Sequence, residues 1–167
     1  QGYIAGLGGY VGRETIAAEG RYALPGFIDG HIHIESSLLS PRAFARAVVP
    51  IGTTAVVTDP HEIANVAGIS GIRYMMNASR NLPLDTFFML PSCVPATALE
   101  DGGARLSAED LAPLLDEPQV LGLAEMMNVP GVLAGDPAVY EKLTMRWGLQ
   151  IEGHAPGLLG KPLMAYA

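Results

Sequence analysis

The stretch PGFIDGHIH, residues 25–33, decides how the rest of this chain is interpreted. Its apolar centre after a Pro-Gly pair is typical of a β-strand. Side chains alternate between the two faces of a strand, so His31 and His33 point the same way and lie close enough to share one metal ion. The plain alternative is two surface histidines at a strand end. Because two of the chain's four histidines fall here, we interpret the stretch as a metal-binding strand.

The composition limits the class of protein. The chain has 167 residues, 49% hydrophobic and 16% charged, which is the balance of a globular domain with a buried core. Its net charge of −7 and the absence of any Lys/Arg cluster argue against nucleic-acid or anionic-membrane partners. One cysteine excludes an internal disulfide. With no bilayer-length apolar run and no leader pattern, we expect a cytoplasmic protein.

Residues 1–24 and the residues after Pro25 differ in composition and in hydrophobic pattern. The first part is rich in Gly and Tyr, and short strands are expected at 15–18 and 22–24. After Pro25 apolar, β-branched runs alternate with helix-like segments. The expected strands are 27–33, 53–58, 85–90, 120–125 and 149–154. The expected helices are 40–51, 68–79, 107–118, 136–147 and one that begins near 161.

This alternation, with a repeat of roughly 30 residues, is typical of βαβ crossovers and a parallel sheet. A doubly wound sheet and a (β/α)8 barrel both fit. Polar residues favour the barrel because they fall at the carboxyl ends of several strands, where barrel enzymes gather their chemistry. These residues are His31, His33, Asp59, His61, Ser92, Glu125 and His154.

A complete barrel needs eight units and five are present, so we expect an α/β fold with a partial (β/α)8, TIM-like barrel. The chain opens on Gln1 and stops at Ala167 inside a helix-like segment. Both observations lead us to expect a fragment of a longer protein.

Four of the strand-end residues form a candidate metal site: His31, His33, Glu125 and His154. Imidazole and carboxylate ligands suit Zn, Mn, Fe or Co better than Ca or Mg. The two oxygens of Glu125 could bridge two ions, and such a site makes hydroxide available near neutral pH. A paired core carboxylate and a buried structural histidine are the alternatives for Glu125 and His154.

Four further residues are candidates for outer roles. Asp29 shares the face of His31 and could orient a ligand by accepting a hydrogen bond. Glu35 continues the same alternation and could contact substrate, or it could be a solvated loop carboxylate. His61 could touch substrate or metal, or could simply occupy a turn after Pro60. Ser92 ends the third strand and is a further candidate for substrate contact.

Several motifs resemble a known family. Residues 24–33, LPGFIDGHIH, resemble the metal-binding opening of the amidohydrolase superfamily. Narrower motifs, in the same order along the chain, resemble the bacterial adenine deaminases of that superfamily. These are IESS at 34–37, GTT at 52–54, TDPHEIANV at 58–66, PSCVPAT at 91–97, LAEMMN at 123–128 and GHAPGL at 153–158.

The resemblance implies hydrolysis of adenine to hypoxanthine and ammonia at a binuclear Mn or Fe site, with Zn possible. It implies that His31 and His33 bind one ion, that Glu125 bridges both as a catalytic ligand, and that His154 binds the other. It also implies that residues 1–24 are the N-terminal part of a small β domain and residues 25–167 the first five barrel units. A purine is then the expected substrate, and a homo-oligomer the expected state of the full-length protein.

The superfamily takes another ligand histidine from strand six and a proton-carrying aspartate from strand eight, and neither position exists in 167 residues. We therefore expect the isolated chain neither to bind two metals tightly nor to deaminate adenine. Two alternatives stay open: an amidohydrolase acting on another amino-purine or a cyclic amide, and a non-catalytic metal-binding or assembly module. Glu152, placed beside His154 by alternation, is left without a role.

Overall fold

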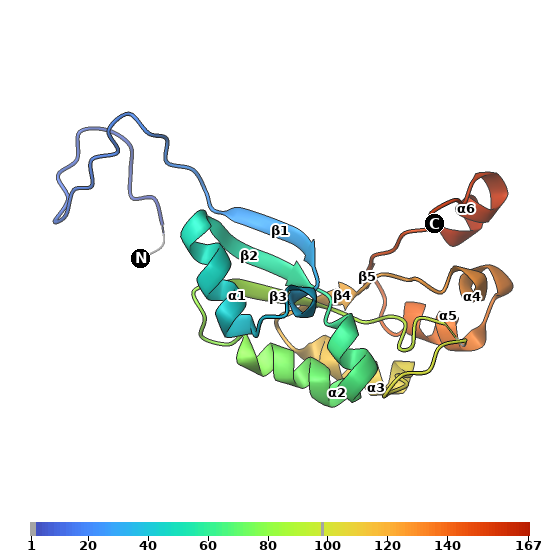
Figure 1. Cartoon of the computed structure of the whole chain (residues 1–167). Coiled ribbons are helices and arrows are strands. Elements are labelled where there is room, and N and C mark those ends of the chain that lie inside the picture. The colour runs from blue at the N-terminus through green and yellow to red at the C-terminus, as the bar shows by residue number, and fades with distance from the viewer. Residues whose placement is uncertain (1–2, 98) are drawn as a thin grey trace.

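The sheet follows chain order, as a barrel requires. The computed structural model describes residues 3–97 and 99–167 (Figure 1). Its five strands are all parallel, and each pairs with the next along the chain. They are β1 (Phe27–Ile32), β2 (Thr53–Thr58), β3 (Asp85–Leu90), β4 (Val120–Leu123) and β5 (Gln150–Ile151). In a doubly wound sheet the spatial order of the strands reverses at a switch point. The unbroken order β1-β2-β3-β4-β5 therefore confirms the partial barrel.

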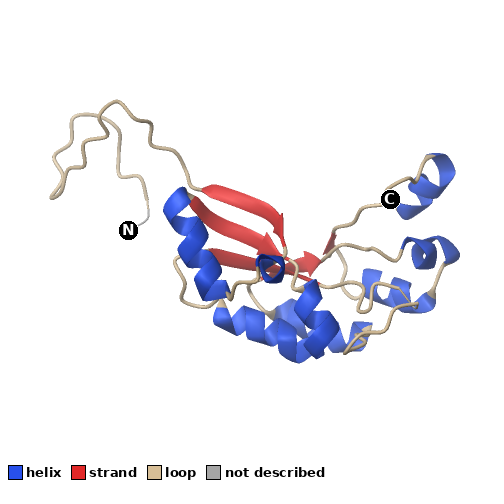
Figure 2. Ribbon diagram, viewed as in Figure 1, coloured by secondary structure: helices blue, strands red, loops and turns tan. Residues whose placement is uncertain are grey.

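Helices cover one side of this sheet (Figure 2). The α-helices are α1 (Pro41–Val48), α2 (His61–Ala78), α3 (Ala108–Leu111), α4 (Val129–Ala134), α5 (Pro137–Leu143) and α6 (Gly160–Tyr166). Short 3-10 turns are η1 (Ile34–Ser37), η2 (Val49–Ile51) and η3 (Ala112–Asp116). None of the helices in the described part of the chain has both the length and the apolar character needed to cross a membrane.

Two predicted helix starts are confirmed by their caps. The Ser40 hydroxyl accepts a hydrogen bond from the Ala43 amide before Pro41 begins α1. Ser107 and Asp110 form a reciprocal capping box at the start of α3. These bonds satisfy amide groups that have no partner inside the helix.

The core lies between the strands and the helices. Val56, Phe88 and Leu123 of the sheet are completely buried, and so are Ile72 of α2 and Leu111 of α3. β1 differs, because its side chains are exposed along most of the strand: Phe27 is 68% and Ile28 71% exposed. The helix side of the sheet is therefore packed, while β1 forms an open edge that carries the histidine pair.

The strands expected at 15–18 and 22–24 are wrong. Residues 3–26 contain neither helix nor strand, and their large apolar side chains are exposed. A three- or four-residue strand exists only by pairing with a neighbour, and the described residues offer this segment none. Its assignment to a small β domain stays a prediction.

Other predicted boundaries shift. α2 begins at His61 and not at Gly68. The non-helical backbone of Gly68 (φ 58°, ψ −143°) kinks α2 into two helical parts, and only the second part was predicted. The helix expected over 136–147 ends at Leu143, and α4 precedes it. β4 and β5 end at Leu123 and Ile151, so Glu125 and His154 lie in the loops that follow.

Candidate metal centre

His31 of β1 and His33, the residue directly after this strand, point to the same side, as alternation predicts. Their Nε2 atoms are 3.3 Å apart, and the rings meet edge to face with centroids 5.1 Å apart. His33 Nδ1 lies 3.0 Å from the Asp59 carbonyl oxygen, which directs its Nε2 toward His31. Asp29 accepts a hydrogen bond from the main-chain amide of His31 at 3.1 Å, so it acts on the backbone and not on the imidazole.

Glu125 reaches this histidine pair from the loop after β4. Its Oε1 lies 3.3 Å from His31 Nε2, and its Oε2 lies 3.4 Å from His33 Nε2. Its side chain is only 17% exposed. One ligand atom from each of the three residues falls within 4.8 Å of the others, which is a group able to hold one metal ion.

His154 approaches the same carboxylate from the loop after β5. Its Nε2 lies 3.4 Å from Glu125 Oε1, and its side chain is about half exposed. It is outside the tight three-residue group. Glu152 contacts the cluster as well, with Oε2 3.5 Å from His31 Nδ1. The loop after β5 therefore adds a third imidazole and a second carboxylate.

The donor set fits a divalent cation. Three imidazoles face one carboxylate at 3.3–3.4 Å, longer than a good charge-assisted hydrogen bond. The two Nε2 atoms of the histidine pair also face each other, an arrangement that a shared cation satisfies. Mixed imidazole and carboxylate ligation is typical of Zn, Mn, Fe or Co.

Two carboxylates near the histidines received no role from sequence reasoning. Asp59 is 2% exposed, and neither of its carboxylate oxygens finds a hydrogen-bond partner among the described residues. Burial, reinforced by the negative charge of Glu125, raises the pKa of Asp59 to about 8. Glu62 Oε2 lies 3.3 Å from His33 Nδ1. The strand-end position of Asp59 was a usable signal, whereas Glu62 depends on the early start of α2.

Glu35 and His61 lie beside the histidine cluster and do not join it. Glu35 accepts a hydrogen bond from the Ile63 amide at 3.3 Å, and burial raises its pKa. His61 Nε2 lies 2.9 Å from the Asn65 side-chain amide, and burial lowers the pKa of His61. Neither residue belongs to the group of ligand atoms around Glu125. Their contact with substrate stays a prediction.

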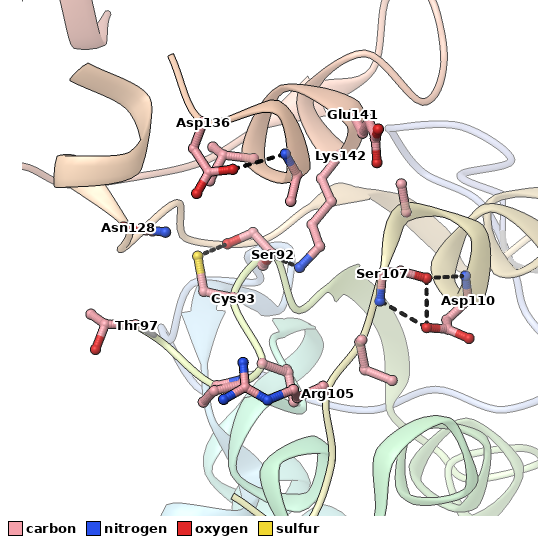
Figure 3. Close-up of a pocket in the computed structure, with 16 residues that line it drawn as sticks. Ser92, Cys93, Thr97, Arg105, Ser107, Asp110, Asn128, Asp136, Glu141 and Lys142 are labelled. Carbon is pink, nitrogen blue, oxygen red and sulfur yellow. Dashed lines mark hydrogen bonds between the residues drawn. The ribbon is translucent and has the colours of Figure 1, made fainter. Parts of the chain in front are cut away.

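Ser92 lies next to Glu125, but through the main chain. Its hydroxyl donates to the Glu125 carbonyl oxygen, and its own carbonyl accepts from Lys142 Nζ at 2.9 Å. Ser92 also lines a cavity of about 330 Å³ together with Cys93, Arg105 and Lys142 (Figure 3). Its contact with substrate stays a prediction as well.

A second cavity opens directly on the cluster. It measures about 380 Å³ and is lined by His31, Glu125, Ile151, Glu152 and Gly153. This volume is within the range of small-molecule sites in proteins. Two of the residues able to hold a metal, His31 and Glu125, therefore border a space that a small ring could enter.

Comparison with known proteins agrees with this geometry. The chain is 56% identical over 165 residues to adenine deaminase 2 of Carboxydothermus hydrogenoformans, covering 99% of the chain and 29% of that relative. It is 59% identical over 166 residues to an adenine deaminase of Syntrophobacter fumaroxidans, with coverage of 99% and 29%. It is 60% identical over 155 residues to one of Nitratidesulfovibrio vulgaris, with coverage of 92% and 27%. The chain thus spans less than a third of the length of these curated relatives.

The family match covers the barrel units and the candidate metal ligands. Residues 22–163 match the amidohydrolase family, a range that includes the three candidate ligand histidines and Glu125. The order of the strands is the one expected from the resemblance of the sequence. On this evidence the chain belongs to the amidohydrolase family.

Proposed function

We propose that this chain is part of an enzyme that hydrolyses adenine to hypoxanthine and ammonia at a divalent-metal site. The convergence of three histidines on Glu125 beside a small cavity carries the proposal. Membership of the amidohydrolase family implies a divalent metal cofactor. The names of relatives at 56–60% identity support adenine as the substrate.

We propose a binuclear site, in which the carboxylate of Glu125 would serve both ions. Its Oε2 faces His33, while its Oε1 faces both His31 and His154. We propose that His31 and His33 hold one ion, that Glu125 bridges, and that His154 holds the other. Mn or Fe is the proposed metal, with Zn as the alternative. When bound, such ions supply a hydroxide at neutral pH by lowering the pKa of a coordinated water.

The residues of this chain would bind and orient the reactants. The Asp59 carbonyl fixes the ring of His33, and Glu152 lies against the other side of His31. The cavity between Glu125 and Gly153 would hold the purine ring. Loss of ammonia also requires a proton at the leaving nitrogen. The resemblance implies that an aspartate of strand eight carries it, and that residue is not among these 167.

The test compares the whole gene product with the 167-residue chain, each loaded with Mn²⁺ and supplied with adenine. Release of ammonia and formation of hypoxanthine by the whole protein, and by it alone, is the expected result. Turnover of a cyclic amide or of another amino-purine in place of adenine would favour the alternative substrate class. A tight, stoichiometric metal site in the isolated chain would instead favour a metal-binding module.

Two broader properties are also proposed. We propose a homo-oligomeric whole protein in the cytoplasm, which sedimentation and cell fractionation would test. The fold agrees with a small-molecule substrate, because two of the candidate ligands, His31 and Glu125, border a cavity of about 380 Å³.

A further inference from the structure

The position of Glu125 depends on its loop. β4 ends at Leu123, so the carboxylate leaves the main chain two residues beyond the regular strand. The flanking amides of Ala124 and Met126 donate to Leu90 and Glu152, at 2.7 and 2.9 Å. These bonds anchor the loop to β3 on one side and to the β5 segment on the other. The Glu125 carbonyl shares one planar peptide with the Met126 amide, so contacts at both ends of that peptide set its orientation.

Ser92 supplies that contact. The residue follows β3 and is 2% exposed, and its hydroxyl donates to the Glu125 carbonyl oxygen. The Met127 amide donates to the same oxygen at 3.0 Å. Together with the bond of the Met126 amide, these two donors hold the peptide that follows the Glu125 Cα, from which the side chain extends to the histidines.

Lys142 in turn holds Ser92. It lies in the last turn of α5, and its ammonium donates to the Ser92 carbonyl oxygen at 2.9 Å (Figure 3). No ion pair in the described part of the chain involves Lys142, although its side chain is half-buried. Partial burial of an ammonium group costs free energy unless the group is hydrogen-bonded. The bond to the Ser92 carbonyl offsets part of that cost and holds the two residues together.

We propose that Ser92 and Lys142 are positioning residues that hold Glu125 in its metal-binding orientation. Hydrogen bonds run from α5 through the end of β3 to the loop after β4. The proposal rests on the proposed metal-binding role of Glu125. It also assigns the Ser92 hydroxyl a role other than donating to substrate, because its single O–H already donates to the Glu125 carbonyl oxygen.

The expected effect is on metal affinity. Loss of an outer hydrogen-bond partner of a metal ligand typically weakens metal binding about 10- to 100-fold. Ser92 and Lys142 act through the main chain, so we expect the lower end, about tenfold, for Ser92→Ala and for Lys142→Met. Lys142→Arg keeps a donor for the same carbonyl and is expected to recover most of the affinity.

The chain offers a matched control for each variant. Ser79 is a buried serine whose hydroxyl has no partner among the described residues, so Ser79→Ala measures the loss of a buried hydroxyl alone. Lys161 is the only other lysine of the chain and is exposed, so Lys161→Met measures the loss of one positive charge. Both controls are expected to bind Mn²⁺ as the wild type does.

The experiment titrates the metal-free whole gene product with Mn²⁺ and follows free Mn²⁺ by electron paramagnetic resonance. A dissociation constant about tenfold higher in Ser92→Ala and Lys142→Met, and unchanged in both controls, is the predicted result. Wild-type affinity in the two test variants would overturn the inference and leave the proposed function standing. A folded wild-type protein that binds no Mn²⁺ would overturn the proposed function itself. If Ser92→Ala does not fold, Lys142→Met decides by the same two outcomes.

Discussion

Glu125 is the residue on which the candidate site converges. Each of its oxygens faces at least one imidazole at 3.3–3.4 Å, and its side chain is largely shielded from water. A carboxylate in this environment needs positive charge nearby, because burial of an unpaired negative charge is costly. A divalent cation bound between the histidines would supply that charge.

Glu125→Gln should therefore remove metal binding and adenine turnover together in the whole protein. Glutamine keeps the shape of the side chain and loses its charge. We expect a loss larger than the roughly 100-fold that an outer partner can cost. Mn²⁺ titration and ammonia release measure it, with the exposed Glu109→Gln as control. Mn²⁺ affinity within a few-fold of the wild type would show that Glu125 is not a ligand.

Side-chain direction was predictable at some of these residues and not at others. Alternation along a strand places His31 and His33 on one side without any knowledge of the loops. The strand-end positions of Glu125 and His154 were enough to propose them as ligands. The contact of Ser92 with the main chain of Glu125 was not predictable, because it depends on how two irregular loops meet. Glu62 was not predicted, because a turn was expected after Pro60, where α2 begins.

At the scale of elements, the capping box of α3 is testable by itself. Ser107→Ala removes the hydroxyl that accepts from the Asp110 amide at 3.2 Å. We expect the free energy of local opening of α3 to fall by about 1 kcal/mol. Amide hydrogen exchange over 108–111 should then quicken about fivefold in the whole protein. An unchanged exchange rate would contradict a stabilising cap.

The same cap should depend on pH through Asp110. Hydrogen bonds from Ser107 lower the pKa of Asp110 below its ordinary value of 3.8. The ionised carboxylate therefore stabilises the folded helix at pH values above 3.8, and this stability is lost as the pH falls through the lowered folded-state pKa. Asp110→Asn should reduce the protection of these amides from hydrogen exchange. This reduction should be constant near neutral pH and should become smaller below pH 3.8. Equal protection in both proteins at neutral pH would refute this.

Gly68 is the element-scale feature that only glycine accommodates. At φ 58° and ψ −143°, a side chain is strained, and a Cβ would lie 3.2 Å from that of Ala104. Gly68→Ala should reduce the free energy of unfolding by about 1–3 kcal/mol, visible as a lower melting temperature. Gly135→Ala is the control. Gly135 has ordinary left-handed backbone angles, and a Cβ added there would meet no other atom within 4 Å. Equal melting temperatures for Gly68→Ala and the wild type would contradict a strained position.

Strands were easier to predict than helix boundaries, and the reason is physical. The run at 53–58 is β-branched and buried, so composition alone favours a strand. The start of α2 follows Pro60, whose side chain makes no cap hydrogen bond, and the kink at Gly68 divides its helical period. Strands at 15–18 and 22–24 would need a partner that the described residues do not provide.

At the scale of the whole molecule, the sheet has two open edges. β1 pairs only with β2, and β5 pairs only with β4, among the described residues. Phe27 and Ile28 of β1 are mostly exposed. Unpaired edge strands with apolar side chains promote association between chains. The surfaces that a complete barrel would cover are therefore exposed in this chain.

The 167-residue chain should consequently self-associate when it is produced alone. Sedimentation velocity over a range of concentrations should show rising mass, whereas the whole gene product should keep one defined mass. The physical reason is pairing of the β1 and β5 edges between molecules. A monodisperse monomer at all concentrations would contradict it.

We propose that the strand-end histidines and Glu125 form the metal site of a hydrolase. The most direct test is to count metal equivalents bound per chain in the metal-reconstituted whole gene product, by elemental analysis, with and without Glu125→Gln. We predict two equivalents in the wild type and loss of bound metal in the variant. A folded wild type without bound metal, or a variant that keeps both equivalents, would contradict the claim.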